Sequence, residues 1–257
     1  MTYPHFIDNG LTEAPVMVLV GSLGTTISMW DDQLREFSGW YRTIAVDLPG
    51  HGGTPVPDER CTVAGFAAEV IALMNALGVD RFAVVGLSFG GAVAQALAAR
   101  YADRVLSVVI ACAVTEYNSD HWHTRALTVR TRGLSEIVQR TAGRRFAPGF
   151  AEREPDAYAR SLLTLSTMNP KGYAACCEAL ATHNARPLLP HITAPALILA
   201  GELDQVTPAA LVQEMTKLIP DSTLRVINGA GHLVNVEKPR VFNAVVADHL
   251  ANSLQRR

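Results

Sequence analysis

The chain contains one serine in a setting that could make it a nucleophile. Ser88 lies in the pentapeptide GLSFG at 86–90, which has the pattern G-x-S-x-G. The apolar run at 82–85 before it predicts a buried strand, and residues 91–100 after it predict a helix. Between a strand and a helix, this pattern is typical of a strained turn that pushes the serine hydroxyl out of the sheet. The sequence therefore predicts a catalytic Ser88, with a passive serine in a glycine-rich loop as the alternative.

A serine hydroxyl needs a base that takes its proton, usually a histidine whose tautomer is held by a carboxylate. In strand–turn–helix arrangements of this kind, the acid and then the histidine follow the serine along the chain. Asp204 and His232 fit that order, because each comes just after a predicted strand. We expect both to emerge at the edge of the sheet that carries Ser88. Glu202 is the alternative acid.

The reaction of a serine with an acyl group also needs N–H donors for the negatively charged oxygen of the tetrahedral intermediate. One donor is expected to be the backbone N–H of Phe89, the residue after the nucleophile. The other is expected to be the N–H of Leu23, in the loop at 21–26 that follows an early strand. The alternative for this loop is an ordinary strand-to-helix turn.

Short apolar runs alternate with segments of helical periodicity along most of the chain. The strands are predicted at 16–20, 43–48, 82–85, 105–110, 196–200 and 224–227. The helices are predicted at 29–37, 62–77, 91–100, 208–218 and 239–254. This alternation predicts an α/β fold with a mostly parallel central sheet and helices on both faces.

One long segment interrupts this alternation. Residues 116–190 contain several helical stretches and no convincing strand, yet they lie between two predicted core strands. We expect a helical cap (lid) at 116–190 inserted into a core of 1–115 and 191–257. A cap above the strand ends is where substrate selection would occur. An insertion without a role in function is the alternative.

Composition narrows the class of protein. The 257 residues are 49% hydrophobic, which allows a substantial core, and the net charge is −2 with no polybasic run. We therefore expect neither a nucleic acid nor a membrane as partner. The four cysteines lack C-x-x-C spacing, which argues against zinc and disulfides. Residues 1–10 lack the features of a signal peptide, and no apolar run reaches 18 residues, so a cytoplasmic protein is expected.

With these residues in place, the chain resembles the α/β-hydrolase superfamily over nearly its whole length. Within it, the chain is most similar to the 3-oxoadipate enol-lactone hydrolases (enol-lactonases) of aromatic-compound degradation. The matching stretches are SLGT at 22–25 with Met29-Trp30, the cap pattern Trp122…Arg125…Arg130…Gly133, and GYA at 172–174 with CEA at 177–179.

The resemblance implies a mechanism and a ligand. Ser88 would open a small lactone through an acyl-enzyme, with no metal and no organic cofactor. The lactone would carry a carboxylate, for which Arg125 and Arg130 are candidate ligands, since arginine binds a carboxylate bidentately. Trp122 would either wall the pocket or anchor the cap. The partner is thus a small-molecule substrate, and the oligomeric state stays open, a homo-oligomer included.

The chain also departs from the lactonases. Leu48-Pro49 stands where they often carry Thr-Arg, residues 1–15 are short for their N-terminal hairpin, and Gly21 stands where many hydrolases, though not the lactonases, have histidine. The alternatives are another carboxylesterase or a C–C bond (meta-cleavage product) hydrolase, with perhydrolase side activity also open on this scaffold. A small-ligand receptor is the alternative outside enzymes, because fold alone does not decide function.

Overall fold

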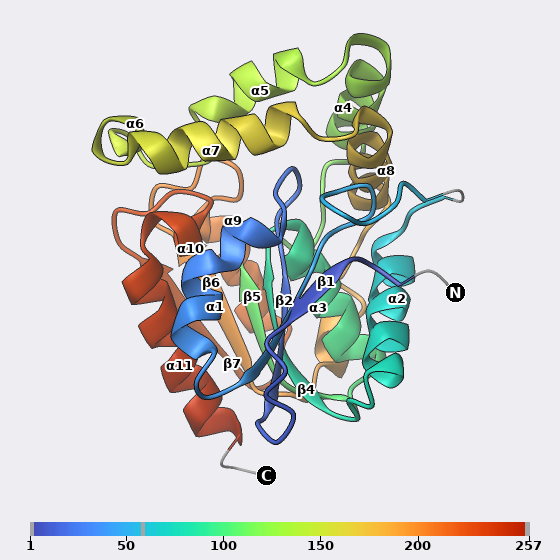
Figure 1. Ribbon diagram of the computed structural model, residues 1–257, viewed down its shortest axis with the longest axis vertical. Helices are drawn as coiled ribbons and strands as arrows, with labels where there is room; N and C mark the ends of the chain where they lie inside the picture. The colour runs from blue at the N-terminus through green and yellow to red at the C-terminus, as the bar shows by residue number, and fades with distance from the viewer. Residues whose placement is uncertain (1–2, 58–59, 255–257) are drawn as a thin grey trace.

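The computed structural model describes residues 3–57 and 60–254. Its centre is a sheet of seven strands in the order β1-β3-β2-β4-β5-β6-β7, in which only β1 runs antiparallel to its neighbour (Figure 1). The strands are β1 (Phe6–Asp8), β2 (Val16–Val20), β3 (Arg42–Val46), β4 (Phe82–Leu87), β5 (Val105–Ala111), β6 (Ala196–Gly201) and β7 (Ser222–Ile227). The mostly parallel sheet predicted from the sequence is confirmed.

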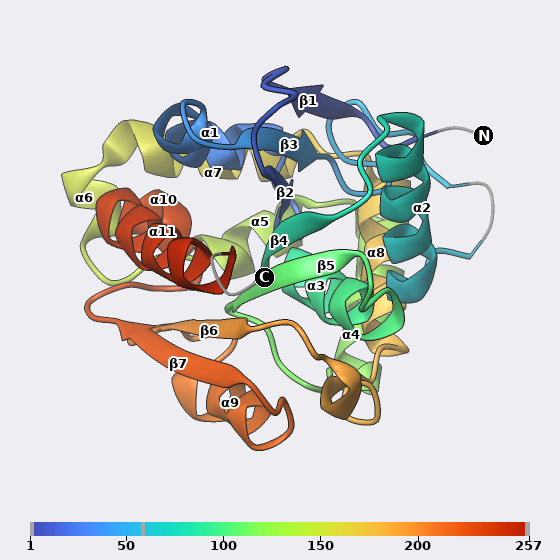
Figure 2. The ribbon, with the colours of Figure 1, turned by 90° about the horizontal axis from the view of Figure 1, so that it is seen from below.

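Helices cover both faces of this sheet (Figure 2). One face carries α2 (Val63–Ala76), α3 (Phe89–Arg100) and α9 (Ala209–Gln213) with its 3-10 extension η3 (Glu214–Lys217). The other carries η1 (Ile27–Trp30), α1 (Asp31–Phe37), α10 (Val234–Glu237) and α11 (Pro239–Leu254). Strand β2 shows why both faces are apolar: Val18 and Val20 pack into one core cluster and Met17 and Leu19 into the other. Alternate side chains of a strand point to opposite faces, so a doubly covered strand is apolar throughout.

Five helices lie between β5 and β6 and cover the carboxyl ends of the strands, at the top of Figure 1. They are α4 (Ser119–Arg132), α5 (Ser135–Ala142), α6 (Phe150–Arg153), α7 (Pro155–Ser166) and α8 (Pro170–Ala181), and the 3-10 turn η2 (Leu189–His191) leads back to β6. We call residues 116–190 the cap. Its two ends meet at a β-bridge between Glu116 and Asn184. The division of the chain into this cap and a core of 1–115 and 191–257 stays a prediction.

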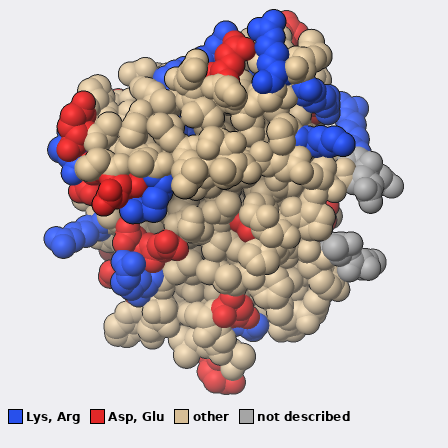
Figure 3. Space-filling model, turned by 45° about the horizontal axis from the view of Figure 1, so that its top comes forward, with Lys and Arg blue, Asp and Glu red and all other residues tan. Residues whose placement is uncertain are grey.

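Other features of the described residues bear on the class of protein. No helix in 3–57 and 60–254 is long and apolar enough to cross a membrane. All four cysteines are buried, and none forms a disulfide. With the cap turned toward the viewer, charged side chains of both signs lie mostly around the rim of the molecule, and its middle is largely uncharged (Figure 3).

The turn between β4 and α3 is held by close backbone contacts. Ser88 lies at φ 58° and ψ −110°, a conformation that L-residues rarely adopt. A Cβ built on Gly90 would lie 1.9 Å from the carbonyl oxygen of Val20, and one on Gly86 would lie 2.0 Å from that of Gly90. Gly90 is therefore required by the approach of α3 to the end of β2, and Gly86 by the return of α3 against the end of β4.

This packing predicts the effect of a single methyl group. Gly90→Ala should reduce the free energy of unfolding by about 3 kcal/mol, because a backbone carbonyl cannot give way as a flexible side chain can. Gly39→Ala is the control, since a Cβ there meets nothing within 4 Å. Urea unfolding of both variants checks this, and a loss below about 1 kcal/mol for Gly90→Ala would contradict it.

Candidate active site

A cavity of about 420 Å³ lies between the carboxyl ends of the strands and the cap. The core contributes Ser88, His232 and Leu23 to its wall, and the cap contributes Trp122 and Arg125. Five of the residues that the sequence singled out thus face one cavity. Residues more than 140 positions apart in the chain meet there because parallel strands all end at the same edge of the sheet.

Asp204 and His232 form a buried hydrogen-bonded pair. The Asp204 Oδ2 accepts a hydrogen bond from Nδ1 of His232 at 2.8 Å and another from the Thr207 hydroxyl at 2.6 Å. The Oδ1 accepts the backbone N–H groups of Val206 and Thr207, at 2.7 and 2.9 Å. Burial alone would raise the pKa of Asp204, but His232 and the Thr207 hydrogen bonds outweigh it and lower that pKa. An ionised Asp204 therefore holds the histidine with its other nitrogen, Nε2, free to act as a base.

Neither Glu202 nor Ser88 forms a hydrogen bond with the His232 side chain among the described residues. Glu202, the alternative acid, accepts the N–H of Gly229 at 2.8 Å and makes no contact with His232 within hydrogen-bonding distance. The Ser88 side chain faces the cavity that His232 also lines, without a hydrogen bond between the two in the described part of the chain. Such bonds are often long in an enzyme without substrate and shorten when it binds.

In the loop after β2, the N–H group of Leu23 has no protein acceptor among the described residues. The Ser22 N–H points at the Met29 sulfur at 3.3 Å, and the Gly24 N–H donates to Nε2 of His51 at 3.0 Å. The N–H of Leu23, between them, has no acceptor among the described residues, and neither has that of Phe89 at the start of α3. Two unpaired donors thus lie next to Ser88, where the sequence predicts donors for an oxyanion.

His51 holds this loop by a hydrogen bond that was not predicted from the sequence. Its Nδ1 donates to the carbonyl oxygen of Pro49 at 2.9 Å, so Nε2 carries no proton and can accept from Gly24. Burial lowers the pKa of His51 to about 4, and the imidazole is therefore neutral at pH 7. The contact joins residues 27 positions apart in two loops, so no local sequence pattern predicts it.

The cap side of the cavity is basic and aromatic. The guanidinium of Arg125 lies 5.3 Å from the ring centroid of Trp122 and 5.6 Å from that of Tyr173. It donates to the Tyr173 hydroxyl at 2.5 Å and to the Thr141 hydroxyl at 3.2 Å. Stacking on two rings fixes the orientation of a cation at a small cost in solvation. Arg140 also lines the cavity, and its guanidinium forms an ion pair with Glu136 of α5.

Arg130 occupies a different place from the one predicted. It forms an ion pair with Glu178 of α8 and is absent from the cavity wall. Residues 125 and 130 are five positions apart on α4, which places them about 140° apart around the helix axis. One face of α4 therefore presents Arg125 to the cavity, while Arg130 joins α4 to α8.

The thiol of Cys112 lies next to the pair formed by Asp204 and His232. Atoms of Cys112, Asp204 and His232 that could ligate a metal lie within 4.8 Å of one another, and all three residues are buried. Burial and then the neighbouring Asp204 carboxylate raise the pKa of the Cys112 thiol well above its usual value. Since the thiol stays protonated and Asp204 already bonds His232, the group has the chemistry of an acid–base pair rather than of a thiolate metal site.

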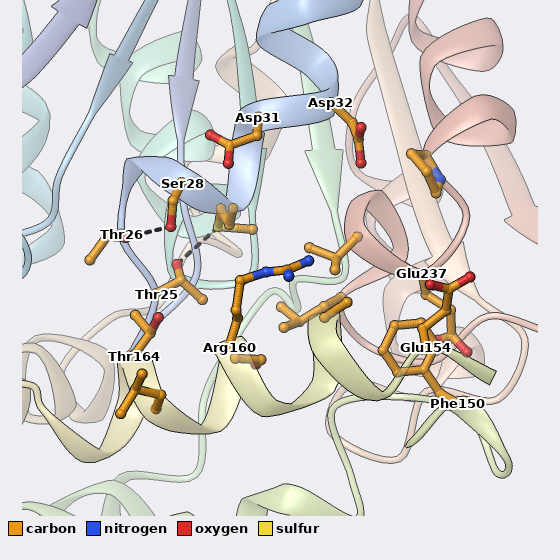
Figure 4. Close-up of a pocket in the computed structure, with 18 residues that line it drawn as sticks. Thr25, Thr26, Ser28, Asp31, Asp32, Phe150, Glu154, Arg160, Thr164 and Glu237 are labelled. Atoms are coloured by element: carbon orange, nitrogen blue, oxygen red, sulfur yellow. Dashed lines mark hydrogen bonds between the residues drawn. The ribbon is translucent and has the colours of Figure 1, made fainter. Parts of the chain in front are cut away.

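A second cavity, of about 390 Å³, opens between α7 and the amino-terminal side of α1 (Figure 4). Arg160 reaches into it from α7, and Asp31 and Asp32 face it from α1. Neither Ser88 nor His232 lines it. We therefore assign the chemistry to the cavity that contains Ser88.

The buried His51 predicts how stability depends on pH. Below pH 6.5 the unfolded chain binds a proton at His51, whereas the folded chain does not until about pH 4, so stability falls as the pH drops through this window. His51→Gln keeps an acceptor for Gly24 and should remove about 3 kcal/mol of that loss. His183, whose pKa burial also lowers to about 4, keeps a similar dependence in both proteins. Urea unfolding from pH 7 to 4 checks this, and equal slopes for the two proteins would contradict it.

Comparison with known proteins agrees with this geometry. A model of the α/β hydrolase fold family matches residues 15–239. The chain is 37% identical to 3-oxoadipate enol-lactonase 2 of Acinetobacter baylyi, with 92% of this chain and 89% of that protein covered.

Solved structures give the same result. The enol-lactonase from Burkholderia xenovorans LB400 superposes with a TM-score of 0.93 at 32% identity, covering 96% of each chain. A thermophilic esterase from Thermogutta terrifontis, with malate bound, gives 0.92 at 27% identity and covers 97% of this chain and 93% of its own. The resemblance predicted from the sequence is confirmed, and the chain belongs to the α/β-hydrolase family.

Proposed function

We propose that this protein is a serine hydrolase that opens a small carboxylate-bearing lactone similar to 3-oxoadipate enol-lactone. The observation that carries the proposal is one cavity lined by Ser88, by His232 with its bonded Asp204, and by Arg125. The similarity to the Acinetobacter and Burkholderia enol-lactonases supports the same substrate class. We propose a role in aromatic-compound degradation in the cytoplasm, with this small molecule as the partner.

The first half of the proposed reaction opens the ring. The Ser88 hydroxyl attacks the lactone carbonyl while Nε2 of His232 takes its proton, and Asp204 stabilises the imidazolium that results. The N–H groups of Leu23 and Phe89 bind the oxyanion. When the tetrahedral intermediate collapses, the ring C–O bond breaks, and His232 returns the proton to the enol oxygen. The enol becomes a ketone, and the acyl group stays on Ser88.

The second half releases the product. Nε2 of His232 takes a proton from a water molecule, whose oxygen attacks the acyl carbon of the Ser88 ester. The same two N–H groups bind the second oxyanion, and Ser88 leaves with the proton from His232. The product is a keto acid with two carboxylates, and no cofactor takes part in any of these steps.

Arg125 is the proposed ligand for the carboxylate that the lactone already carries. Its Nη1 makes no hydrogen bond among the described residues, while Nε and Nη2 are held by Tyr173 and Thr141. One edge of a fixed guanidinium is therefore free for a ligand. Malate, bound to the similar esterase, is likewise a small molecule with carboxylates. Trp122 would wall this end of the cavity through its stack on Arg125.

That esterase also supports a second candidate function, the hydrolysis of carboxylate-bearing open-chain esters. The chemistry at Ser88 would be the same for an ester and a lactone, and only the leaving group differs. The leaving alcohol of an ester diffuses away, whereas that of a lactone stays attached to the acyl group. Direct comparison of a lactone and a p-nitrophenyl ester separates the two candidates.

The proposed nucleophile is tested by Ser88→Ala. With freshly generated 3-oxoadipate enol-lactone, followed by ultraviolet absorbance, this variant should lose about 10⁴- to 10⁶-fold in kcat, as serine-protease knockouts do. Retention of more than about a tenth of wild-type activity would exclude Ser88 as the nucleophile. A wild type that cleaves a p-nitrophenyl ester but leaves the lactone intact would keep the triad and reject the lactone as substrate.

The proposed carboxylate ligand is tested by Arg125→Gln. Loss of one charged hydrogen-bonding partner should raise KM for the anionic lactone about 10- to 100-fold, and leave a neutral p-nitrophenyl ester nearly unchanged. Arg132→Gln is the matched control, because Arg132 lies on the same helix, is exposed and pairs with Glu136. Steady-state kinetics on both substrates checks this. Equal losses on both would mean that Arg125 supports the cap and does not bind the substrate.

A further inference from the structure

We propose that Arg145 is a positioning residue, which holds the oxyanion loop around Leu23 and the loop of His232 in their working arrangement. The inference rests on the proposed function, because it concerns the same reaction. Arg145 belongs to the cap, in the segment between α5 and α6. It forms hydrogen bonds with both of these loops of the core.

The side chain of Arg145 holds the oxyanion loop. Its Nη2 donates to the carbonyl oxygen of Leu23 at 2.9 Å, and both Nη1 and Nη2 lie 3.4 Å from that of Gly24. The Nη1 also donates to the Ser161 hydroxyl of α7, at 3.3 Å. Only 3% of the residue is exposed. One rigid guanidinium thus binds two successive carbonyl groups, which a lysine ammonium could not match in geometry.

The backbone of Arg145 holds the other catalytic loop. Its carbonyl oxygen accepts the N–H groups of His232 and Leu233, each at 2.9 Å. The buried Glu237 carboxylate reinforces this contact, because it accepts the N–H of Gly231 at 2.7 Å and that of Ala147 at 3.1 Å. The segments on either side of Arg145 and His232 are therefore fastened to each other at several points.

The charge of Arg145 has no carboxylate partner in the described part of the chain. Burial lowers its pKa to about 10, which still leaves it charged at neutral pH. Burying a cation without a counter-ion costs free energy. Hydrogen bonds to the carbonyl groups of Leu23 and Gly24 offset part of that cost for Arg145. A residue needed only for packing would not require this charge, so the arrangement points to a role in the reaction.

The geometry explains how Arg145 would affect catalysis. The N–H of Gly24 is fixed by His51, and its carbonyl and that of Leu23 by Arg145. These contacts fix the peptide after Leu23. The Leu23 N–H lies on the adjoining peptide, whose Ser22 carbonyl oxygen accepts the Thr25 N–H at 3.2 Å and the Thr25 hydroxyl at 2.7 Å, so both peptides that meet at Leu23 are held. Gly24 itself lies at φ +74°, and a Cβ there would be 2.7 Å from Nη2 of Arg145. An oxyanion donor displaced by about 1 Å can cost about 10²-fold in rate.

Arg145 also lines the cavity, so it could instead bind the carboxylate of the substrate. The two roles differ in what they change. A ligand for the carboxylate acts on KM and only on anionic substrates. A positioning residue for the oxyanion hole acts on kcat and on every acyl substrate, charged or neutral.

The experiment uses Arg145→Met and Arg145→Lys with the anionic enol-lactone and neutral p-nitrophenyl acetate. Arg145→Met should lower kcat about 10²-fold on both substrates with KM within about 3-fold of wild type. Arg145→Lys should lower it about 10-fold, because an ammonium keeps the charge but reaches one carbonyl at a time. The rate at which a fluorophosphonate labels Ser88, followed by intact mass, should fall by similar factors. Arg132→Met is the control for loss of a cap arginine, and thermal unfolding confirms that each variant is folded.

Several results would overturn the inference. A folded Arg145→Met with wild-type kcat, or a rise in KM confined to the lactone, would exclude a positioning role. Should the Met variant not fold, a folded Arg145→Lys with wild-type kcat and labelling rate would exclude it equally.

Failure of the proposed function gives a different pattern. A wild type that hydrolyses p-nitrophenyl acetate through Ser88 but not the lactone rejects the lactone, while the ester and labelling rates still decide the role of Arg145. A wild type in which Ser88 neither reacts with the fluorophosphonate nor turns over the ester would reject both.

Discussion

The arrangement of the site depends on how tightly the turn at Ser88 fits between β2 and β5. The N–H of Ser88 donates to the carbonyl oxygen of Ala111 at 2.8 Å, and that of Gly90 donates to Gly21 at 2.9 Å. The first contact fixes the turn to the end of β5, and the second fixes it to the start of the oxyanion loop. The left-handed backbone of Ser88 is retained because both neighbours hold it. The proposed nucleophile and the loop of the proposed donor Leu23 are thereby positioned by the same pair of strands.

Backbone hydrogen bonds also join the loops that follow the other strands of the sheet. The N–H of Cys112, after β5, donates to Leu199 of β6 at 2.8 Å, and that of Leu203, after β6, donates to Ala230 at 2.9 Å. A Cβ on Gly201 would lie 2.1 Å from the carbonyl oxygen of Gly231. The loops of the acid and the histidine are thus joined directly after their strands end. The Ser88 turn is bonded to the end of β5, the Asp204 loop to Ala230 after β7, and His232 to Arg145 of the cap, so little freedom is left to the site.

What the sequence could predict follows from the range of the interactions involved. Strand β2 and helix α11 have the predicted bounds, because a buried apolar run and an amphipathic segment are local patterns. Strand β1 was missed, since its three residues form no such run, and the predicted helix at 29–37 begins with the 3-10 turn η1. Strand β1 pairs with β3 over three residues.

The residues of the site also differ in whether a local sequence pattern predicts their position. Ser88, Asp204 and His232 follow strands, so their common edge could be inferred from the alternation of elements. The contact of Arg145 with Leu23 could not be predicted in this way, because the two residues are 122 positions apart and Arg145 belongs to no strand or helix. The placement of Arg130 was open to a local argument, since five positions on a helix separate its direction from that of Arg125. The departure at Leu48-Pro49 lies outside the wall of the cavity, so it gives no direct reason to change the substrate class.

Under the proposed function, the cap arginines Arg125 and Arg145 have different roles. Arg125 is held by aromatic rings and hydroxyls and keeps one edge free, so we expect a change there to alter what the cavity binds. The Arg145 guanidinium is held by carbonyl groups of the core, so a change there alters the loop that the nucleophile needs. Helices of the cap could therefore exchange residues at the cavity wall with little effect on the reaction at Ser88. We expect the segment at 145–147 to tolerate less change, because it is bonded to the loop of Leu23, to the loop of His232 and to Glu237.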